Sequence, residues 1–122
     1  IHNMFNPIII RIPPSNFFFT LIARIFDVEM LGLMIFPFIF INDEVTERNI
    51  LLHETIHFQQ CKETLVVGFY TIFILEFIFN ILKYRGDLHT AYINIRFERE
   101  AYAYMNSCNY LEEREAFAWL KE

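Results

Sequence analysis

The sequence is poor in the residues that interrupt regular structure, with three glycines and four prolines among 122 residues. So few breakers leave little room for linkers or low-complexity segments, and we expect one domain over residues 1–122 with a single core. Basic runs are missing and the formal net charge is -5, which argues against nucleic acid as a partner. The two cysteines, Cys61 and Cys108, are too few for a disulfide framework, and we expect both to be buried free thiols.

The first part of the chain, residues 1–45, has a β-rich pattern. Ile8–Ile12 is β-branched and precedes two prolines, so it predicts a short strand followed by a turn. The apolar run Phe17–Phe26 fits either a strand or a helix. Met34–Ile41 predicts a strand that Pro37 either places at a sheet edge or breaks in two.

The second part, residues 46–122, has a helical pattern. Thr46 is a suitable N-cap for a helix that runs to about Thr64. Apolar residues at helical spacing predict two further helices, over Ala91–Asn106 and Tyr110–Lys121, with Trp119 as a core or interface anchor. The expected fold class is therefore α+β and mainly α, with a short N-terminal sheet followed by helices.

The segment Leu65–Leu82 is apolar over 18 residues except for Thr71, Glu76 and Asn80. It predicts one long helix, or a hairpin bent near Gly68. Its length is close to that needed to cross a bilayer, but Glu76 near its middle would be costly in lipid. We expect burial within the protein or against a partner, with membrane contact as the alternative. The long aromatic stretches also favour burial against a second copy of the chain, a partner assembly or lipid.

A His-Glu-x-x-His motif lies in the first predicted helix, at residues 53–57. Residues four apart share one face of a helix, so the imidazoles of His53 and His57 can converge on one point. Zinc binds such nitrogen donors and, with an open position, makes a nucleophile of water near neutral pH. Glu54 is adjacent to the first histidine and can take the proton of that water.

A catalytic zinc site needs a third protein ligand. Glu63 follows the motif but points away from His57 if the helix continues, and Glu76 fits better as a satisfied polar group in an apolar helix. The better candidates lie on a later helix, where Glu98 and Glu100 precede the small residue Ala101, which permits close packing. The alternative for Glu100 is a solvated carboxylate paired with a neighbouring arginine, Arg96 or Arg99.

With these motifs the chain resembles the gluzincin zinc metallopeptidases, and in layout their minimal single-domain members, the minigluzincins. In that family a downstream helix supplies a glutamate within Glu-x-x-Ala, which Glu98-Arg99-Glu100-Ala101 matches. The chain also resembles small bacterial and phage proteins with His-Glu-x-x-His-x-x-Gln and a later Phe-Glu-Arg-Glu-Ala. The matches cover about half of the chain, roughly Ile50 to Tyr104.

The resemblance implies a zincin-like domain in which His53, His57 and Glu98 bind zinc and Glu54 is the general base, with Glu100 as the fallback ligand. It also implies a sheet edge that binds an extended peptide or protein substrate, to which Phe36–Ile41 corresponds. The acidic residue that often follows the third ligand by four positions is Tyr102 here, which removes an expected hydrogen-bond partner of a ligating histidine.

The function expected from these residues is hydrolysis of peptide bonds with zinc as the cofactor. A donor to the developing oxyanion is also required, and the candidates are His89, Tyr92, Tyr102 and Tyr104. The alternative from another class is a non-catalytic structural or interaction protein of a larger assembly that retains the zinc-binding fold. A third alternative is a membrane peptidase with its active site beside the apolar Leu65–Leu82 segment.

Overall fold

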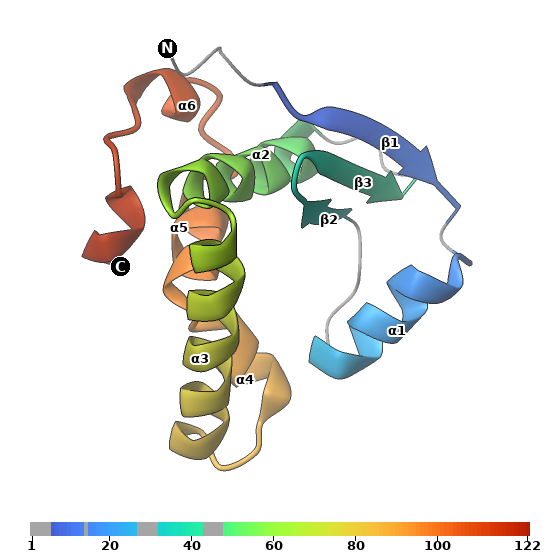
Figure 1. The fold of residues 1–122 in the computed structure, drawn as a ribbon, viewed down its shortest axis with the longest axis vertical. Coiled ribbons are helices and arrows are strands. Elements are labelled where there is room, and N and C mark those ends of the chain that lie inside the picture. Colours follow the sequence, from blue (N-terminus) through green and yellow to red (C-terminus); the bar gives the residue numbers. More distant parts are fainter. Residues whose placement is uncertain (1–5, 14, 27–31, 43–47) are drawn as a thin grey trace.

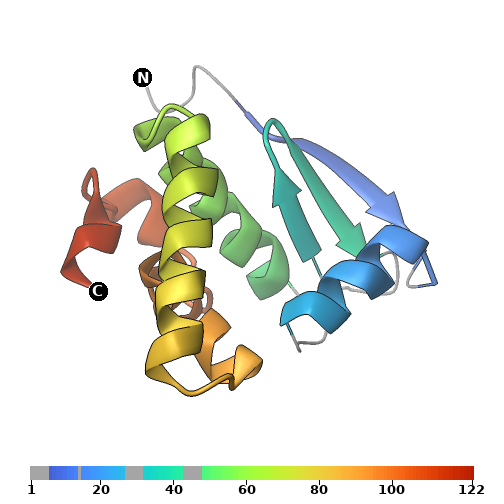
Figure 2. The same ribbon diagram turned by 60° about the horizontal axis from the view of Figure 1, so that its bottom comes forward.

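A computed structural model describes residues 6–13, 15–26, 32–42 and 48–122 of the chain (Figures 1 and 2). The fold is α+β and mainly helical, with a short N-terminal sheet followed by helices, which confirms the expected class. The elements are β1 (Ile8–Ile12), α1 (Phe17–Phe26), β2 (Gly32–Ile35), β3 (Phe38–Asn42), α2 (Arg48–Glu63), α3 (Val67–Lys83), α4 (Leu88–Ile93), α5 (Arg96–Tyr104), α6 (Tyr110–Glu113) and a 3-10 turn, η1 (Ala118–Lys121). The predicted N-cap Thr46 lies outside the described residues.

The described strands form one sheet in the order β1-β3-β2. β1 is parallel to β3, and β2 is antiparallel to β3. The predicted strand Met34–Ile41 is therefore broken at Phe36-Pro37, as expected of a residue that has no N–H for a strand ladder. Ile39 and Ile41 of the central strand β3 are buried and face the core, whereas Ile8 and Ile9 of β1 are about half exposed.

The run Phe17–Phe26, which fits a strand or a helix by sequence, is the helix α1. Asn16 caps the N-terminus of α1, because its side-chain Oδ1 accepts hydrogen bonds from the backbone N–H groups of Phe18, at 2.9 Å, and Phe19, at 3.4 Å. Phe19 is buried, whereas Phe17 is 78% exposed. The β-rich first part of the chain thus also carries a helix with one buried and one exposed apolar face.

Most of the apolar segment Leu65–Leu82 folds as one continuous helix, α3, which starts at Val67, and not as a hairpin bent near Gly68. The chain bends before that helix, where Leu65 and Val66 have φ of 58° and 66°. The Val66 N–H donates to the Cys61 carbonyl at 2.8 Å and so closes the end of α2. Among the described residues no single helix is long and apolar enough to cross a membrane; α2 and α3 meet those criteria only together, as a pair bent by 111°.

The polar residues inside α3 are satisfied by the helices beside it. Glu76 accepts hydrogen bonds from the backbone N–H of Arg96 at 3.0 Å and from its Nε at 2.8 Å. Asn80 Nδ2 donates to the Ala91 carbonyl at 3.0 Å. These contacts confirm that Glu76 is a paired polar group within an apolar helix. On the other face of α3, the apolar side chains of Ile74, Leu75, Ile78, Phe79 and Leu82 are exposed.

Two predicted C-terminal helices are shorter than expected. Ala91–Asn106 is divided at Asn94-Ile95, since the Arg96 N–H donates to Glu76 and α5 starts anew there. Tyr110–Lys121 is not one amphipathic helix: α6 ends at Glu113, and Arg114 adopts an extended conformation. Arg114 leaves the helix because its guanidinium binds carboxylates of α2 and α5, long-range contacts that helical periodicity does not reveal.

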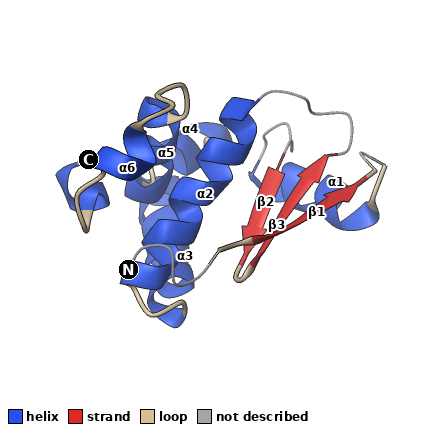
Figure 3. Cartoon of the chain, turned by 90° about the horizontal axis from the view of Figure 1, so that it is seen from above, coloured by secondary structure: helices blue, strands red, loops and turns tan. Residues whose placement is uncertain are grey.

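The core lies between the sheet, α2, α3 and α5. In Figure 3, α2 lies between the sheet on one side and α5 on the other. Phe58 of α2 stacks on Phe36 with ring centroids 5.0 Å apart, and Phe97 of α5 stacks on Phe69 of α3 at 4.6 Å. Trp119 is 5% exposed against Phe97, which confirms it as a core anchor. α2 is thus held from both sides.

Replacing Leu65 with glycine is expected to stabilise the fold. The Leu65 side chain is 84% exposed, and its backbone is in the left-handed helical conformation. That conformation costs a residue with a β-carbon roughly 1–2 kcal/mol. Glycine removes that penalty but loses more entropy on folding, so we expect a net gain of about 0.5–1 kcal/mol in the free energy of unfolding. Urea denaturation of Leu65→Gly measures it. Leu65→Ala is the control, since it keeps the β-carbon; an equal gain in both variants would show that exposure of the leucine, and not its backbone, is responsible.

Candidate metal centre

Two helices bring together the three residues expected to bind a metal. α2 presents His53 and His57 one turn apart, and α5 presents Glu98 to both. The two imidazole Nε2 atoms are 3.2 Å apart, and each is near one carboxylate oxygen: His53 Nε2 to Oε1 at 3.1 Å, and His57 Nε2 to Oε2 at 2.9 Å. The three side chains form a buried group that could hold a metal ion.

The spacing of these donor atoms suits a single ion. Donors that bind zinc at about 2.0–2.2 Å in a tetrahedral arrangement lie roughly 3.3–3.6 Å apart. The separations here run from 2.9 to 3.2 Å, so a small outward movement would accommodate an ion between them. Both histidines approach through Nε2, so their rings are already turned toward a common point.

The charges within the group are also those that a cation would balance. The three residues are 2% to 5% exposed. Burial lowers the pKa of His57, but the Glu98 carboxylate outweighs burial and raises that pKa to about 9. Burial in turn raises the pKa of Glu98, but the imidazoles of His57 and His53 outweigh it and hold that pKa well below its usual range. The buried carboxylate therefore keeps its charge and requires positive charge beside it.

Glu54 lies beside this group and is separate from it. Its Oε2 is 4.0 Å from His53 Nε2, and burial raises the pKa of the Glu54 carboxyl. Gly32 of β2 makes room for it, since a β-carbon at that position would lie 3.0 Å from Glu54 Cγ. A carboxylate whose affinity for a proton is raised next to a metal position is suited to proton transfer.

Gln60 is a site residue that the sequence reasoning missed. Its Oε1 accepts a hydrogen bond from His57 Nδ1 at 2.7 Å, which directs the other ring nitrogen of His57 into the site. The sequence feature that could have identified Gln60 is its position three residues after His57, on the same face of the helix. His53 differs: its buried Nδ1 has no hydrogen-bond partner in the described part of the chain, and its ring packs edge-on against Tyr102 at 4.5 Å.

Glu63 and Glu76, the two disfavoured ligand candidates, lie elsewhere. Glu63 Oε2 accepts from Arg114 Nη1 at 2.7 Å, at the end of α2. Glu76 is bound to Arg96, as described above. Neither belongs to the group of residues that could hold the ion.

Glu100, the fallback ligand, is also directed away from the histidines. It is fully buried, and its carboxylate accepts hydrogen bonds from Gln60, Tyr110 and Arg114. The alternative of a solvated carboxylate paired with Arg96 or Arg99 is therefore wrong, because the C-terminal segment folds over α5 and covers this residue. Of the two glutamates of α5, Glu98 is the one that faces His53 and His57.

Two of the four candidate oxyanion donors lie near the site. Tyr92 lines the cleft above it, and burial together with the nearby Glu98 carboxylate raises the pKa of its hydroxyl well above the usual value. Tyr102 packs on the first motif histidine, and burial raises its pKa to about 12, so the hydroxyl keeps its proton. Tyr104 instead stacks on a tyrosine of α6, and His89 is exposed on α4.

An apolar cleft of about 260 Å³ opens over the site. Glu54, His57 and Glu98 lie within it, and most of the other lining residues are apolar side chains of α1, β2 and α3. Phe36–Ile41 was expected to form a substrate-binding edge of the sheet. It does not, because β3 pairs with a strand on each side. The strand that borders the cleft is Gly32–Ile35, which is an outer strand of the sheet.

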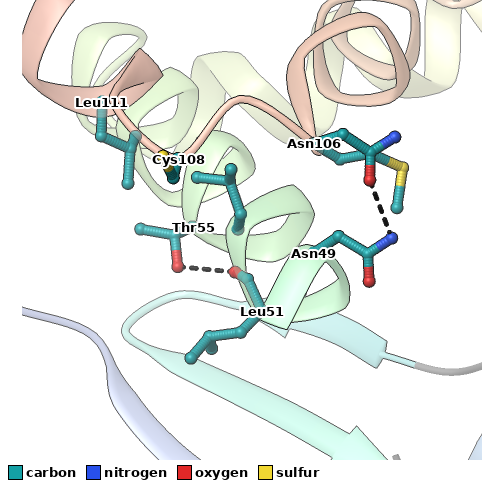
Figure 4. A pocket seen from close by; sticks show the side chains of 8 residues that line it. Asn49, Leu51, Thr55, Asn106, Cys108 and Leu111 are labelled. Atoms are coloured by element: carbon teal, nitrogen blue, oxygen red, sulfur yellow. Dashed lines mark hydrogen bonds between the residues drawn. The ribbon is translucent and has the colours of Figure 1, made fainter. Parts of the chain in front are cut away.

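A second pocket of about 420 Å³ lies between α2 and the chain that follows α5 (Figure 4). Asn49 Nδ2 donates to Asn106 Oδ1 across it at 3.1 Å. Cys108 lines this pocket and is exposed, so the expectation of a buried thiol is wrong there, since Cys108 lies in a turn after α5. Cys61 is buried as expected, and burial raises its pKa to about 12. None of the predicted ligands lines this pocket.

Comparisons with known proteins do not assign the chain to a family, because no family model, no curated protein and no solved structure matches it. The functional interpretation therefore depends on the geometry and chemistry of the site itself.

Removing the Glu98 carboxylate is expected to abolish tight metal binding. Glu98→Ala leaves two imidazoles, whereas stable sites use three or four protein ligands. Titration of the metal-free protein with Zn²⁺, followed by calorimetry and metal analysis, should give one equivalent for the wild type and less for this variant. Glu112→Ala, which removes an exposed carboxylate of α6, is expected to retain one equivalent. Equal binding by all three proteins would place the metal elsewhere.

Proposed function

We propose that this protein is a zinc-dependent metallopeptidase of the gluzincin type, in which His53, His57 and Glu98 hold the metal and Glu54 is the general base. The observation that carries the proposal is the buried convergence of two Nε2 atoms and one carboxylate, with a second carboxylate beside them at the base of a cleft. Neutral imidazoles and a carboxylate are ligands typical of catalytic zinc, whereas calcium and magnesium prefer oxygen donors alone.

The metal and the protein divide the chemistry between them. Bound zinc would polarise the substrate carbonyl and lower the pKa of water. Glu54 accepts the proton of the attacking water and delivers it to the leaving amine, and its raised pKa suits both transfers near neutral pH. The two candidate donors to the carbonyl oxygen are Tyr92, which lines the cleft, and Tyr102, whose ring packs on His53.

The cleft supports an extended peptide or protein segment as the substrate. β2 is an outer strand beside the site, and an outer strand can pair with the backbone of an extended chain. Phe69, Phe73 and Leu33 are among the cleft residues, and together with their neighbours they make a largely apolar wall. An apolar side chain next to the scissile bond fits this wall better than a charged one.

A second function, that of a non-catalytic interaction protein that retains the metal, is favoured by the exposed apolar faces of α1 and α3. Phe17, Leu75, Phe79 and Leu82 are 61% to 78% exposed. Surfaces of this kind bind protein partners, further copies of the chain or lipid. In a peptidase the same faces would position a partner or substrate near the cleft, because Phe18 of α1 and Ile74 of α3 line it.

Replacing the general base separates the two functions. Glu54→Gln is expected to abolish cleavage of a peptide library while keeping one equivalent of zinc, because the amide occupies the same space but accepts no proton. Mass spectrometry of the library detects cleavage. Glu112→Gln, an exposed glutamate of α6, is the control and should cleave as the wild type does. Zinc-loaded wild type that cleaves nothing would favour the interaction protein, and cleavage retained by Glu54→Gln would contradict the proposed mechanism.

Adding a methyl group above Glu54 is expected to impair turnover without removing the metal. A β-carbon on Gly32 would be 3.0 Å from Glu54 Cγ and 3.2 Å from Ile41 Cδ1, so the glutamate must move. Displacing a catalytic group by a fraction of an ångström costs about tenfold or more in kcat/KM. Peptide cleavage by zinc-loaded Gly32→Ala measures the loss, and Gly68→Ala is the control because it adds a methyl group near Thr64 instead. Unchanged turnover in Gly32→Ala would show that the position of Glu54 is not critical.

A further inference from the structure

A chain of buried hydrogen bonds runs from His57 away from the metal position to the C-terminal segment. His57 Nδ1 is 2.7 Å from Gln60 Oε1, and Gln60 Nε2 is 2.9 Å from Glu100 Oε1. Glu100 then binds Arg114, with its Oε2 2.6 Å from the guanidinium Nε. Gln60 and Glu100 are fully buried, and the Arg114 side chain is 5% exposed.

The donors and acceptors available on each partner determine which group donates in each of these hydrogen bonds. The Gln60 amide has two N–H groups, and Nε2 donates both to pure acceptors, the Phe97 carbonyl at 3.0 Å and the Glu100 carboxylate. Its oxygen must then face His57, where it can only accept. His57 Nδ1 therefore carries a hydrogen, and in the neutral ring Nε2 presents its lone pair to the metal position.

Arg114 and Tyr110 hold Glu100 in place from outside the site. The Tyr110 hydroxyl donates to Glu100 Oε2 at 2.6 Å, and Arg114 Nη2 donates to Oε1 at 3.1 Å. Arg114 also binds Glu63 at the end of α2, at 2.7 Å. A buried carboxylate that did not have these donors would be free to turn or to take up a proton, and the amide of Gln60 would lose its fixed partner.

We propose that Gln60, Glu100 and Arg114 form a positioning relay, through which the C-terminal segment sets the orientation and the proton-bearing nitrogen of the metal ligand His57. This inference rests on the proposed metal site and assigns roles to residues outside it. Glu100 thus acts on the metal through His57, although it is not a ligand.

The two glutamates that bind Arg114 provide a matched pair of variants. Glu100→Gln and Glu63→Gln each remove one carboxylate charge from the same guanidinium. Glu100 contacts Gln60, whereas Glu63 binds Arg114 and the Phe117 N–H at 2.8 Å. A general loss of stability would affect metal binding equally in both variants, whereas the relay predicts an effect of Glu100→Gln alone.

The first measurement is the affinity of the full chain for Zn²⁺, by competition with a chromophoric chelator. Gln60→Met, which keeps the volume but cannot accept the His57 hydrogen, is expected to weaken binding by about 10–100-fold. Glu100→Gln should give a smaller loss, and Glu63→Gln should retain the wild-type affinity. Circular dichroism confirms that each variant is folded, and if Gln60→Met does not fold, the isosteric Glu100→Gln carries the test.

The second measurement needs no metal. The His57 Nδ1 hydrogen, observed by ¹H–¹⁵N NMR, is expected to exchange slowly with water in the wild type and in Glu63→Gln, and rapidly in Gln60→Met. Equal zinc affinity and equal exchange in Glu100→Gln and Glu63→Gln would overturn the relay. Wild type that binds no zinc but protects this hydrogen would refute the proposed metal site and leave the hydrogen-bonded relay in place.

Discussion

The structure depends on the contact between α2 and α5, because this contact buries a carboxylate against two imidazoles. Ala101 is fully buried, and its small side chain lets the two helices approach. Burying the Glu98 charge is unfavourable unless positive charge and hydrogen bonds compensate it. His53 and His57 supply both within 3.1 Å. Such a cluster is poorly suited to stabilising a small domain, and buried titratable groups beside a cleft are typical of functional sites.

The other buried and partly buried carboxylates support this contact in different ways. Glu76 of α3 accepts the Arg96 N–H and so fixes where α5 begins, two residues before Glu98. Glu63 and Glu100 bind the same guanidinium, which ties the end of α2 to the middle of α5. Each of these acids has an arginine partner, whereas Glu54 and Glu98 line the cleft with only the motif histidines beside them. Glu98 is held between both imidazoles, whereas Glu54 lies 4.0 Å from the nearer one and burial raises its pKa, a combination that supports the proposed role of Glu54 in proton transfer.

The outer faces of α1 and α3 have the opposite character. They are apolar and exposed, although the same two helices contribute to the wall of the cleft. Exposed apolar surfaces of this kind are typical of faces that associate with a partner. The candidate metal centre and these apolar faces adjoin each other, so in the proposed peptidase a partner on α1 and α3 would lie close to the substrate.

The sequence by itself determined what depends on local spacing. Four-residue spacing placed His53 and His57 on one face of a helix, and β-branched residues gave the strand Ile8–Ile12. The tertiary structure decided what depends on distant partners. The sequence left Glu98 and Glu100 as alternative ligands, and only the packing of α5 on α2 turned one to the histidines and the other to Arg114. Helical periodicity predicted Tyr110–Lys121 as one helix, but a buried ion pair outweighs the local preference of Arg114. Spacing along the chain fixes which side chains share a face, and long-range pairing of charges fixes where each face points.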